Sequence, residues 1–270
     1  MTPPTRITRL FDGLRRDGRK GLIAFLTAGD PAPQRTPALV EALVRGGADL
    51  IELGVPFSDP VADGPVIQRA GERALAAGTT LRRVLEIAVE IRRRSEAPLL
   101  LFTYLNPVLR YGLERLAADA ARAGIDGCLL TDLSVEEAGE YVAAMRRHHL
   151  DTVFLAAPTS TPRRLRLVAE YSTGFVYLVS RTGVTGERDA LSSAVGPLVS
   201  AMRSLTGKPL AVGFGVSRPE QVAEVGKLAD AVVVGSALVR VIERLGSSPD
   251  LETELETFTR ALKAGLGAGA

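Results

Sequence analysis

Short apolar runs alternate with segments of helical periodicity along most of the chain, and this alternation limits the possible folds more than any other feature. The runs are almost continuously apolar, which is typical of parallel strands buried on both faces. Between them, apolar residues recur at spacings of mostly three and four, as in residues 81–91, which indicates amphipathic helices. The sequence therefore predicts eight strands, at residues 21–28, 48–55, 99–105, 127–133, 152–157, 174–180, 210–216 and 231–234.

Alternating strand–helix units build a parallel sheet with right-handed crossovers. Eight such units in 270 residues favour a closed (β/α)8 TIM barrel, so we expect residues 1–270 to form one α/β domain of this type. Residues 1–20 are expected to add an extra N-terminal helix at the bottom of the barrel. The alternative is an open doubly wound sheet, which normally carries a nucleotide-binding fingerprint. The Gly-x-Gly at residues 213–215 lacks the third glycine of that fingerprint, because position 218 is arginine.

Capping residues indicate where several helices begin and end. Ser134 stands where a cap is expected for a helix over residues 136–147. Pro219 fits the first turn of another helix, since proline needs no hydrogen-bond donor there. Gly47 and Gly124 fit helix stops before the second and fourth strands.

Composition excludes several classes of protein. The chain has 33 Lys and Arg against 31 Asp and Glu, and the resulting net charge of +2 gives no electrostatic footprint for nucleic acid. Its single cysteine, Cys128, excludes an internal disulfide framework, and two histidines are too few for most metal centres. The early apolar run at residues 22–28 is much shorter than the ~20 residues of a membrane helix. We therefore expect a cytoplasmic protein with no metal, no membrane partner and no nucleic-acid partner.

Glu52 lies inside an apolar run, near the end of the second predicted strand. Both faces of a barrel strand are buried, so a carboxyl group there is either paired with a cation or kept neutral by a raised pKa. A raised pKa suits a general acid–base near neutral pH, and catalytic residues of TIM barrels lie at the carboxyl ends of strands. Glu52 is therefore our first candidate catalytic residue. A buried ion pair with an arginine is the structural alternative.

Asp63 is the second candidate, in the loop that follows the same strand. Prolines at positions 56, 60 and 65 stiffen this loop, which suits a carboxylate that must be held in place. Asp59 and Asp63 also fit ordinary turn chemistry, and Asp63 could simply cap the next helix. The connections at residues 56–80 and 181–191 are longer than a barrel needs, so both are candidate lids on the catalytic face.

A phosphate site is predicted where the last two strands end. The seventh strand ends in Gly213-Phe214-Gly215 and the eighth in Gly235-Ser236, and a helix follows each. Backbone N–H groups and the positive end of a helix dipole bind anions, and glycines let the backbone approach closely. In TIM barrels the loops after strands seven and eight frequently form such a site. Glycines needed only for turns are the alternative.

The distribution of lysine and histidine narrows the chemistry. No lysine lies at the carboxyl end of a predicted strand, so a Schiff-base aldolase is not expected. His148 and His149 are adjacent and do not share a helix face, so a metal aldolase is not expected either. Two carboxylates beside a phosphate site then indicate proton-transfer chemistry. Tyr104 and Tyr177 are candidate pocket residues, since a buried hydroxyl needs a partner.

Several motifs resemble the tryptophan synthase α subunit family over residues 8–262. The most specific are ELGVPFSDP at 52–60 and ADGP at 62–65. Others are TAGDP at 27–31, NPV at 106–108, YLVSRTGVTG at 177–186, GFGV at 213–216 and VGSA at 234–237. The resemblance implies a TIM-barrel lyase that reversibly cleaves indole-3-glycerol phosphate to indole and glyceraldehyde 3-phosphate.

The resemblance also implies a role for each matching residue. Glu52 would be the general acid–base, Asp63 would accept a hydrogen bond from the indole N–H, and Tyr177 would lie by the glycerol chain. Thr185 would close towards Asp63. The other substrate-binding residues would be Phe25, Tyr104, Leu129 and Phe214 around the indole, with Gly186, Gly213, Gly215, Gly235 and Ser236 around the phosphate.

A partner is implied as well. The family works with a β subunit that carries pyridoxal phosphate, in an α2β2 heterotetramer, while the α chain needs no cofactor. The loops after strands two and six, with Asp59, would face that partner. Leu105 and Ser134 differ from the residues usual in the family. The alternatives are a free-standing lyase, a non-catalytic activator of a β subunit, or another phosphate-binding barrel such as an isomerase.

Overall fold

The strands form one parallel sheet that curls round into a barrel, as predicted. The computed structural model describes residues 3–179, 195–213 and 215–267. Neighbouring strands follow the order β5-β4-β3-β2-β1-β9-β8-β7-β6, and every pair is parallel. The strands are β1 (Gly21–Thr27), β2 (Leu50–Gly54), β3 (Leu99–Thr103), β4 (Gly127–Leu130), β5 (Asp151–Thr152), β6 (Phe154–Ala156), β7 (Val176–Val179), β8 (Leu210–Gly213) and β9 (Ala231–Val234).

The fifth predicted strand is split, which is why the described residues form nine strands and not eight. The segments β5 and β6 are separated only by Val153. The first pairs with β4 and the second with β7, so this one stretch of chain joins the two ends of the sheet. Val153 itself donates its backbone N–H to the carbonyl of Cys128 in β4, at 3.2 Å. The barrel therefore closes through a bend that apolar periodicity does not reveal.

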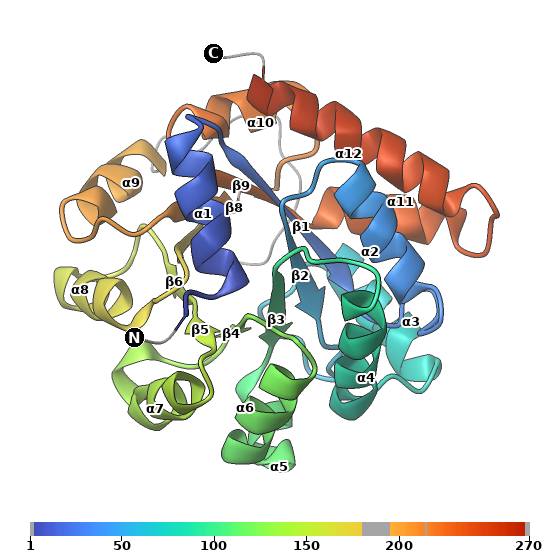
Figure 1. The fold of residues 1–270 in the computed structure, drawn as a ribbon, viewed down its shortest axis with the longest axis horizontal. Coiled ribbons are helices and arrows are strands. Elements are labelled where there is room, and N and C mark those ends of the chain that lie inside the picture. Colours follow the sequence, from blue (N-terminus) through green and yellow to red (C-terminus); the bar gives the residue numbers. More distant parts are fainter. Residues whose placement is uncertain (1–2, 180–194, 214, 268–270) are drawn as a thin grey trace.

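Helices surround the strands in a ring (Figure 1). Within the described residues, no helix is long and apolar enough to cross a membrane. The helices are α1 (Arg6–Arg16), α2 (Thr36–Arg45), α3 (Pro65–Ala76), α4 (Leu81–Arg92), α5 (Leu105–Tyr111), α6 (Leu113–Arg122), η1 (Val135–Glu137, a 3-10 turn), α7 (Gly139–Arg147), α8 (Pro162–Tyr171), α9 (Val195–Arg203), α10 (Pro219–Gly226), α11 (Ser236–Leu245) and α12 (Leu251–Gly267).

Most of the predicted helix ends are confirmed, with one correction. Gly47 and Gly124 follow α2 and α6 with φ angles of 101° and 81°, which favour glycine, and α10 begins at Pro219. The helix predicted over residues 136–147 is wrong at its start, because η1 precedes a separate α7. Ser134 caps neither element with its side chain, since its hydroxyl hydrogen-bonds the Glu136 carboxylate instead.

The extra N-terminal helix is confirmed and closes the bottom of the barrel. One face of α1 buries Ile7, Phe11 and Leu14 against alternate residues of the strands. The Phe11 and Phe175 ring centroids lie 5.6 Å apart. The interior thus has an apolar plug at the amino ends of the strands, and the opposite end is left for a pocket. The other buried residues in this inner cluster lie in the strands or directly beside them: Ile23, Leu50, Leu100, Leu129, Val153, Phe175, Ala211, Ala231 and Val233.

Three aspartates join neighbouring strands at this bottom end by the same device. Each precedes a strand and exchanges two hydrogen bonds with the backbone of a residue in the adjacent strand: its carboxylate accepts that residue's N–H, and its own N–H donates to that residue's carbonyl. Each carboxylate is also paired with a cation. The sets are Asp49 with Leu22 and Lys263, Asp126 with Leu99 and Arg92, and Asp230 with Leu210 and Arg203.

Replacing Asp126 by alanine is expected to lower the free energy of unfolding by about 3 kcal/mol. The substitution leaves the buried backbone N–H of Leu99 without its side-chain acceptor and the largely buried guanidinium of Arg92 without its carboxylate. Asp126 and Arg92 side chains are 5% and 13% exposed. Glu96→Ala is the matched control: Glu96 pairs with Arg6, which also contacts Asp126, but its side chain is 80% exposed. Urea denaturation should leave this control close to wild type, and equal losses in both variants would contradict the anchoring role.

Candidate active site

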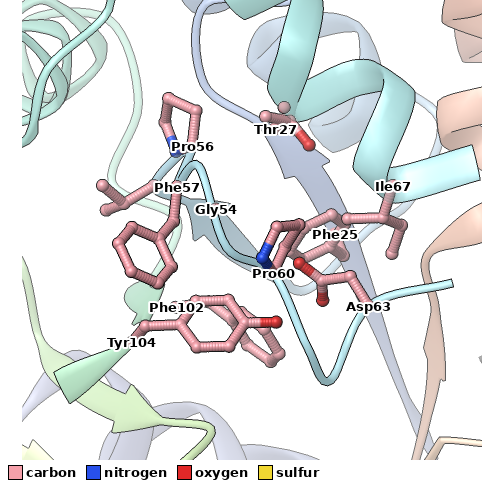
Figure 2. Close-up of a pocket in the computed structure, with 12 residues that line it drawn as sticks. Phe25, Thr27, Gly54, Pro56, Phe57, Pro60, Asp63, Ile67, Phe102 and Tyr104 are labelled. Carbon is pink, nitrogen blue, oxygen red and sulfur yellow. The ribbon is translucent and has the colours of Figure 1, made fainter. Parts of the chain in front are cut away.

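A narrow pocket opens at the carboxyl ends of β1, β2 and β3, beneath the loop after β2 (Figure 2). Its walls are mainly apolar and aromatic, with the carboxylate of Asp63 and the hydroxyls of Tyr104 and Thr27 as polar groups. Such a pocket suits a flat apolar ligand that is oriented by a few polar contacts. The lining residues are Phe25, Thr27, Gly54, Val55, Pro56, Phe57, Pro60, Asp63, Ile67, Gly71, Phe102 and Tyr104.

Glu52 lies on the inner face of β2, where the strand register places it between Phe25 and Leu100. It is 1% exposed, and its Oε1 has no hydrogen-bond partner. No ion pair joins it to an arginine or lysine within the described residues. Burial raises the pKa of its carboxyl group to about 8. The sequence left open whether Glu52 is paired with a cation or kept neutral by a raised pKa. The structure favours the second, so the carboxyl group is mostly protonated at pH 7.

Asp63 is held at the edge of the pocket by Tyr104. The Tyr104 hydroxyl accepts the backbone N–H of Ala62 at 3.0 Å and donates to the Asp63 carboxylate, and the two side chains point toward one another in Figure 2. Burial raises the pKa of Asp63 to about 6, and the hydrogen bond from Tyr104 opposes that rise. The N-cap of α3 is Gly64, so Asp63 is not the capping residue.

The aromatic walls come from three elements. Phe25 and Phe102 meet edge to face, with centroids 5.2 Å apart at 74°, and Phe57 packs on Tyr104 at 5.2 Å. Gly54 is required here, because a Cβ at that position would lie 2.6 Å from Cζ of Phe25. Phe57 and Phe102 line the pocket although the sequence pattern did not predict them there. The period of two along β3, once its register is known, places Phe102 on the same face as Leu100.

Tyr177 lies inside the barrel on β7, and its ring covers Gly213 of the neighbouring β8. A Cβ on Gly213 would lie 2.5 Å from the Tyr177 hydroxyl oxygen, so glycine makes room for the ring. Burial, and then the charge of Glu52, raise the pKa of Tyr177 well above its usual value. The hydroxyl therefore stays protonated and able to donate near the Glu52 carboxyl group.

The predicted phosphate cradle lies at the ends of β8 and β9, which are neighbours in the sheet. Gly235 is the N-cap of α11 and Ser236 is its first residue, so backbone N–H groups at a helix N-terminus face the barrel mouth. Gly215 has a φ of 68°, which favours glycine. Three further residues of the predicted site, Thr185, Gly186 and Phe214, lie outside the described residues.

Leu129 is fully buried inside the barrel and pairs with Phe102 in the strand register. It is not among the residues that line the described pocket.

Among the residues that the structure describes, no group of three His, Cys, Asp or Glu side chains is arranged to hold a metal ion. The described part of the site offers a buried neutral carboxylic acid on β2, an ionisable carboxylate at the pocket edge and a helix N-terminus after β9. Of these groups, only the carboxylate of Asp63 lines the pocket.

Replacing Glu52 by glutamine is expected to raise the free energy of unfolding by about 4 kcal/mol at pH 8. Between the ordinary pKa of 4.5 and the folded-state pKa of about 8, the folded protein keeps a proton that the unfolded chain loses, so wild-type stability falls as pH rises through this window. Glutamine does not titrate, so the gain over wild type should be small at pH 5 and largest near pH 8. Urea denaturation across this range, with the surface variant Glu72→Gln as control, checks this, and a difference independent of pH would contradict it.

Comparison with known proteins finds similarity over nearly the whole chain. The model of the family "Tryptophan synthase alpha chain" matches residues 11–266. The tryptophan synthase alpha chain of Solibacter usitatus is 74% identical over 266 residues, which cover 98% of this chain and 100% of the relative. That of Geobacter sulfurreducens is 50% identical, over 97% of this chain and 99% of the relative.

Solved structures agree as well. A structure of Mycobacterium tuberculosis tryptophan synthase aligns with a TM-score of 0.91 at 40% identity, and the alignment covers 99% of this chain and 100% of that one. Tryptophan synthase subunit alpha from Legionella pneumophila aligns with a TM-score of 0.89 at 35% identity, over 98% and 99% of the two chains. The family resemblance seen in the motifs is confirmed, and the chain belongs to the tryptophan synthase alpha chain family.

Proposed function

We infer that this protein is a carbon–carbon lyase that reversibly cleaves indole-3-glycerol phosphate to indole and glyceraldehyde 3-phosphate. The observation that carries this function is Glu52, a buried carboxyl group with a pKa near 8 on β2, paired in the strand register with the pocket residue Phe25. A retro-aldol cleavage without a Schiff base needs an acid that holds its proton at neutral pH and can release it to carbon. Glu52 is in that state.

The reaction assigns two proton transfers to Glu52. In the first, the carboxylic acid donates its proton to C3 of the indole ring, and the ring becomes a cationic indolenine. In the second, the resulting carboxylate takes the proton of the glycerol hydroxyl next to the ring, the carbon–carbon bond breaks, and its electrons return to the ring. Indole and an aldehyde leave, and Glu52 regains the proton it gave. Tyr177, whose pKa is raised by burial and then by the charge of Glu52, is proposed to donate a hydrogen bond to the glycerol chain.

Asp63 serves the charge that develops on the ring. Its carboxylate, with a pKa near 6, is ionised at pH 7 and can accept the indole N–H. The attraction grows as the ring becomes cationic, so this contact stabilises the transition state more than the ground state. Thr185 is proposed to close towards Asp63. Phe25 and Tyr104 are proposed to hold the indole between them, with Leu129 and Phe214 completing its surroundings.

The phosphate ester is proposed to bind at the ends of β8 and β9. Gly235 and Ser236 offer backbone N–H groups at the start of α11, and the helix dipole favours a doubly negative group there. Gly215, just past the neighbouring strand end, has a φ of 68° and no side chain to block the backbone. Gly213, at the end of β8, and Gly186, from the loop after β7, are proposed to contribute to the same site. The ring and the phosphate would thus lie on opposite sides of the barrel mouth, with Glu52 between them.

We also propose a β-subunit partner, which would carry pyridoxal phosphate and consume the indole in an α2β2 heterotetramer. Two apolar side chains are exposed near the mouth, Val61 at 75% and Leu109 at 60%. The segments that carry them are joined, because the backbone N–H of Ala62, next to Val61, donates to the hydroxyl of Tyr104, which precedes the helix α5 that carries Leu109. Together with Asp59 they form a surface suited to a protein partner.

A cytoplasmic location completes the proposal. It is in keeping with the single cysteine, Cys128, which is buried and forms no disulfide.

Glu52→Gln is expected to lower the rate of indole release from indole-3-glycerol phosphate by at least ~10²–10⁴-fold, because glutamine neither donates nor accepts the transferred proton. Asp63→Asn should also slow the reaction, since the neutral amide loses the attraction to the cationic ring. Indole release is measured with and without a β subunit. Unchanged turnover of Glu52→Gln would refute the mechanism, and an inactive wild type that still accelerates the partner would identify a non-catalytic activator.

Leu109→Asp is expected to reduce the acceleration by a β subunit at least ~10-fold while indole release by the isolated chain stays near wild type, because a charge at the centre of an apolar contact must be desolvated. Leu205→Asp is the control, since Leu205 is also partly exposed but follows α9 and precedes β8, at the other end of the barrel. Equal acceleration of wild type and Leu109→Asp would show that the partner binds elsewhere.

A further inference from the structure

Asp30 belongs to the TAGDP segment after β1, and the proposed reaction leaves it without a role. Its side chain is 1% exposed. Both of its carboxylate oxygens accept from one guanidinium: Nε of Arg73 lies 2.7 Å from Oδ1 and Nη2 lies 2.8 Å from Oδ2. This fork-to-carboxylate geometry is the strongest form of ion pair between side chains. Arg73 lies on α3, so the pair ties α3 to the loop after β1.

The same guanidinium reaches a third element. Nη1 of Arg73 donates to Oε1 of Glu243, on α11, at 3.1 Å. Glu243 also accepts two hydrogen bonds from Arg69, one turn earlier on α3, at 2.6 and 2.9 Å. Arg73 is therefore the only link in this set that contacts both Asp30 and α11. We call Asp30, Arg73 and Glu243 the strut.

An apolar layer packs beneath the strut. Ala70 of α3 and Val239 of α11 are fully buried in one cluster with Phe25, and Val66 and Ile67 pack against it. The two helices therefore contact each other and the wall of the candidate pocket. Helix α3 is an extra element in the connection between β2 and α4, so its position is set by these contacts and not by the barrel's regular repeat.

Both helices begin at the candidate site. Helix α3 begins at Pro65, two residues after Asp63, and α11 begins at Ser236 in the phosphate cradle. Arg73 and Glu243 lie eight and seven residues into their helices, roughly 12 and 10 Å along the axes at 1.5 Å per residue. The hydrogen bond between Arg73 and Glu243 lies at a similar distance from both helix starts, so it fixes the position of one start relative to the other.

We propose that Arg73 is a positioning residue that sets the separation between Asp63 and the Gly235–Ser236 cradle. We call Asp63 with its pocket and the Gly235–Ser236 cradle the two half-sites. The inference rests on the proposed function, because only a substrate that carries a ring and a phosphate on one molecule requires both half-sites at a fixed distance. A substrate that spans two half-sites benefits from their preorganisation, whereas a fragment that fills one of them does not.

Arginine is needed in this role because its planar fork can hold Asp30 and still reach Glu243. A lysine would keep the charge and lose the fork. Asp30 depends on the partner, since burial raises the pKa of its carboxyl group and the contact with Arg73 opposes that rise. The outer arginine, Arg69, contacts Glu243 but not Asp30 and is 48% exposed, so it offers a matched comparison on the same helix.

The test compares Arg73→Gln, Arg73→Lys and Arg69→Gln in the full chain. Arg73→Gln is expected to raise KM for indole-3-glycerol phosphate about 10-fold and to lower kcat about 10-fold, since sub-ångström to 1 Å misplacement is enough for such losses. Glycerol 3-phosphate and indole, measured separately by calorimetry, should bind within about twofold of wild type. Arg73→Lys should show a smaller change in the same direction, and Arg69→Gln should match wild type in all four measurements.

Other outcomes separate the possible roles. Arg73 variants that lose stability in urea but keep kcat and KM within twofold would show that the strut only stabilises the fold, which overturns the proposal. Equal weakening of indole-3-glycerol phosphate and of the two fragments would overturn it as well, because the half-sites themselves would then be damaged. If Arg73→Gln does not fold, the same comparison is made with Arg73→Lys. Failure of the proposed function is distinct, since the wild type would then release no indole.

Discussion

The dry interior of a closed parallel barrel is the constraint on which the site depends. Each strand sends alternate side chains inward, and α1 seals the amino end with Ile7, Phe11 and Leu14. A carboxyl group in that interior has no water to stabilise its charge, so Glu52 keeps its proton to a pKa near 8. The same closure that stabilises the fold therefore produces an acid that works at neutral pH.

Carboxyl groups have opposite surroundings at the two ends of the barrel. At the amino ends, Asp126 has a guanidinium and a backbone N–H as partners, so its charge anchors one strand to the next. Near the carboxyl ends, Glu52 has an oxygen without any partner. An unpaired buried polar atom lowers stability, so this end gives up stability for reactivity. Asp63, bonded by Tyr104 and partly reached by solvent, lies between these extremes.

Sequence alone predicts what depends on local pattern. The apolar runs and the glycine stops predicted the barrel and the helix ends, and residues 1–20 predicted its extra helix. The phosphate cradle stays a prediction, although a helix does begin after each of the last two strands, as the strand-end glycines suggested. The interruption at Val153 and the separation of η1 from α7 were missed, because the apolar pattern runs on through both positions. Phe102 required the register between strands. The pairing of Asp30 with Arg73 joins residues 43 positions apart and becomes visible only in three dimensions.

The long connection after β2 combines two properties that a catalytic loop needs. Its first part is stiffened by Pro56, Pro60 and Pro65 and is tied to β3 through the bond from Ala62 to Tyr104. Its second part, α3, is packed on α11 and bonded to the loop after β1. A barrel leaves each such connection free to move relative to the next one. Contacts between neighbouring connections, and not the barrel strands alone, therefore set the distance between Asp63 and the start of α11, where the phosphate is proposed to bind.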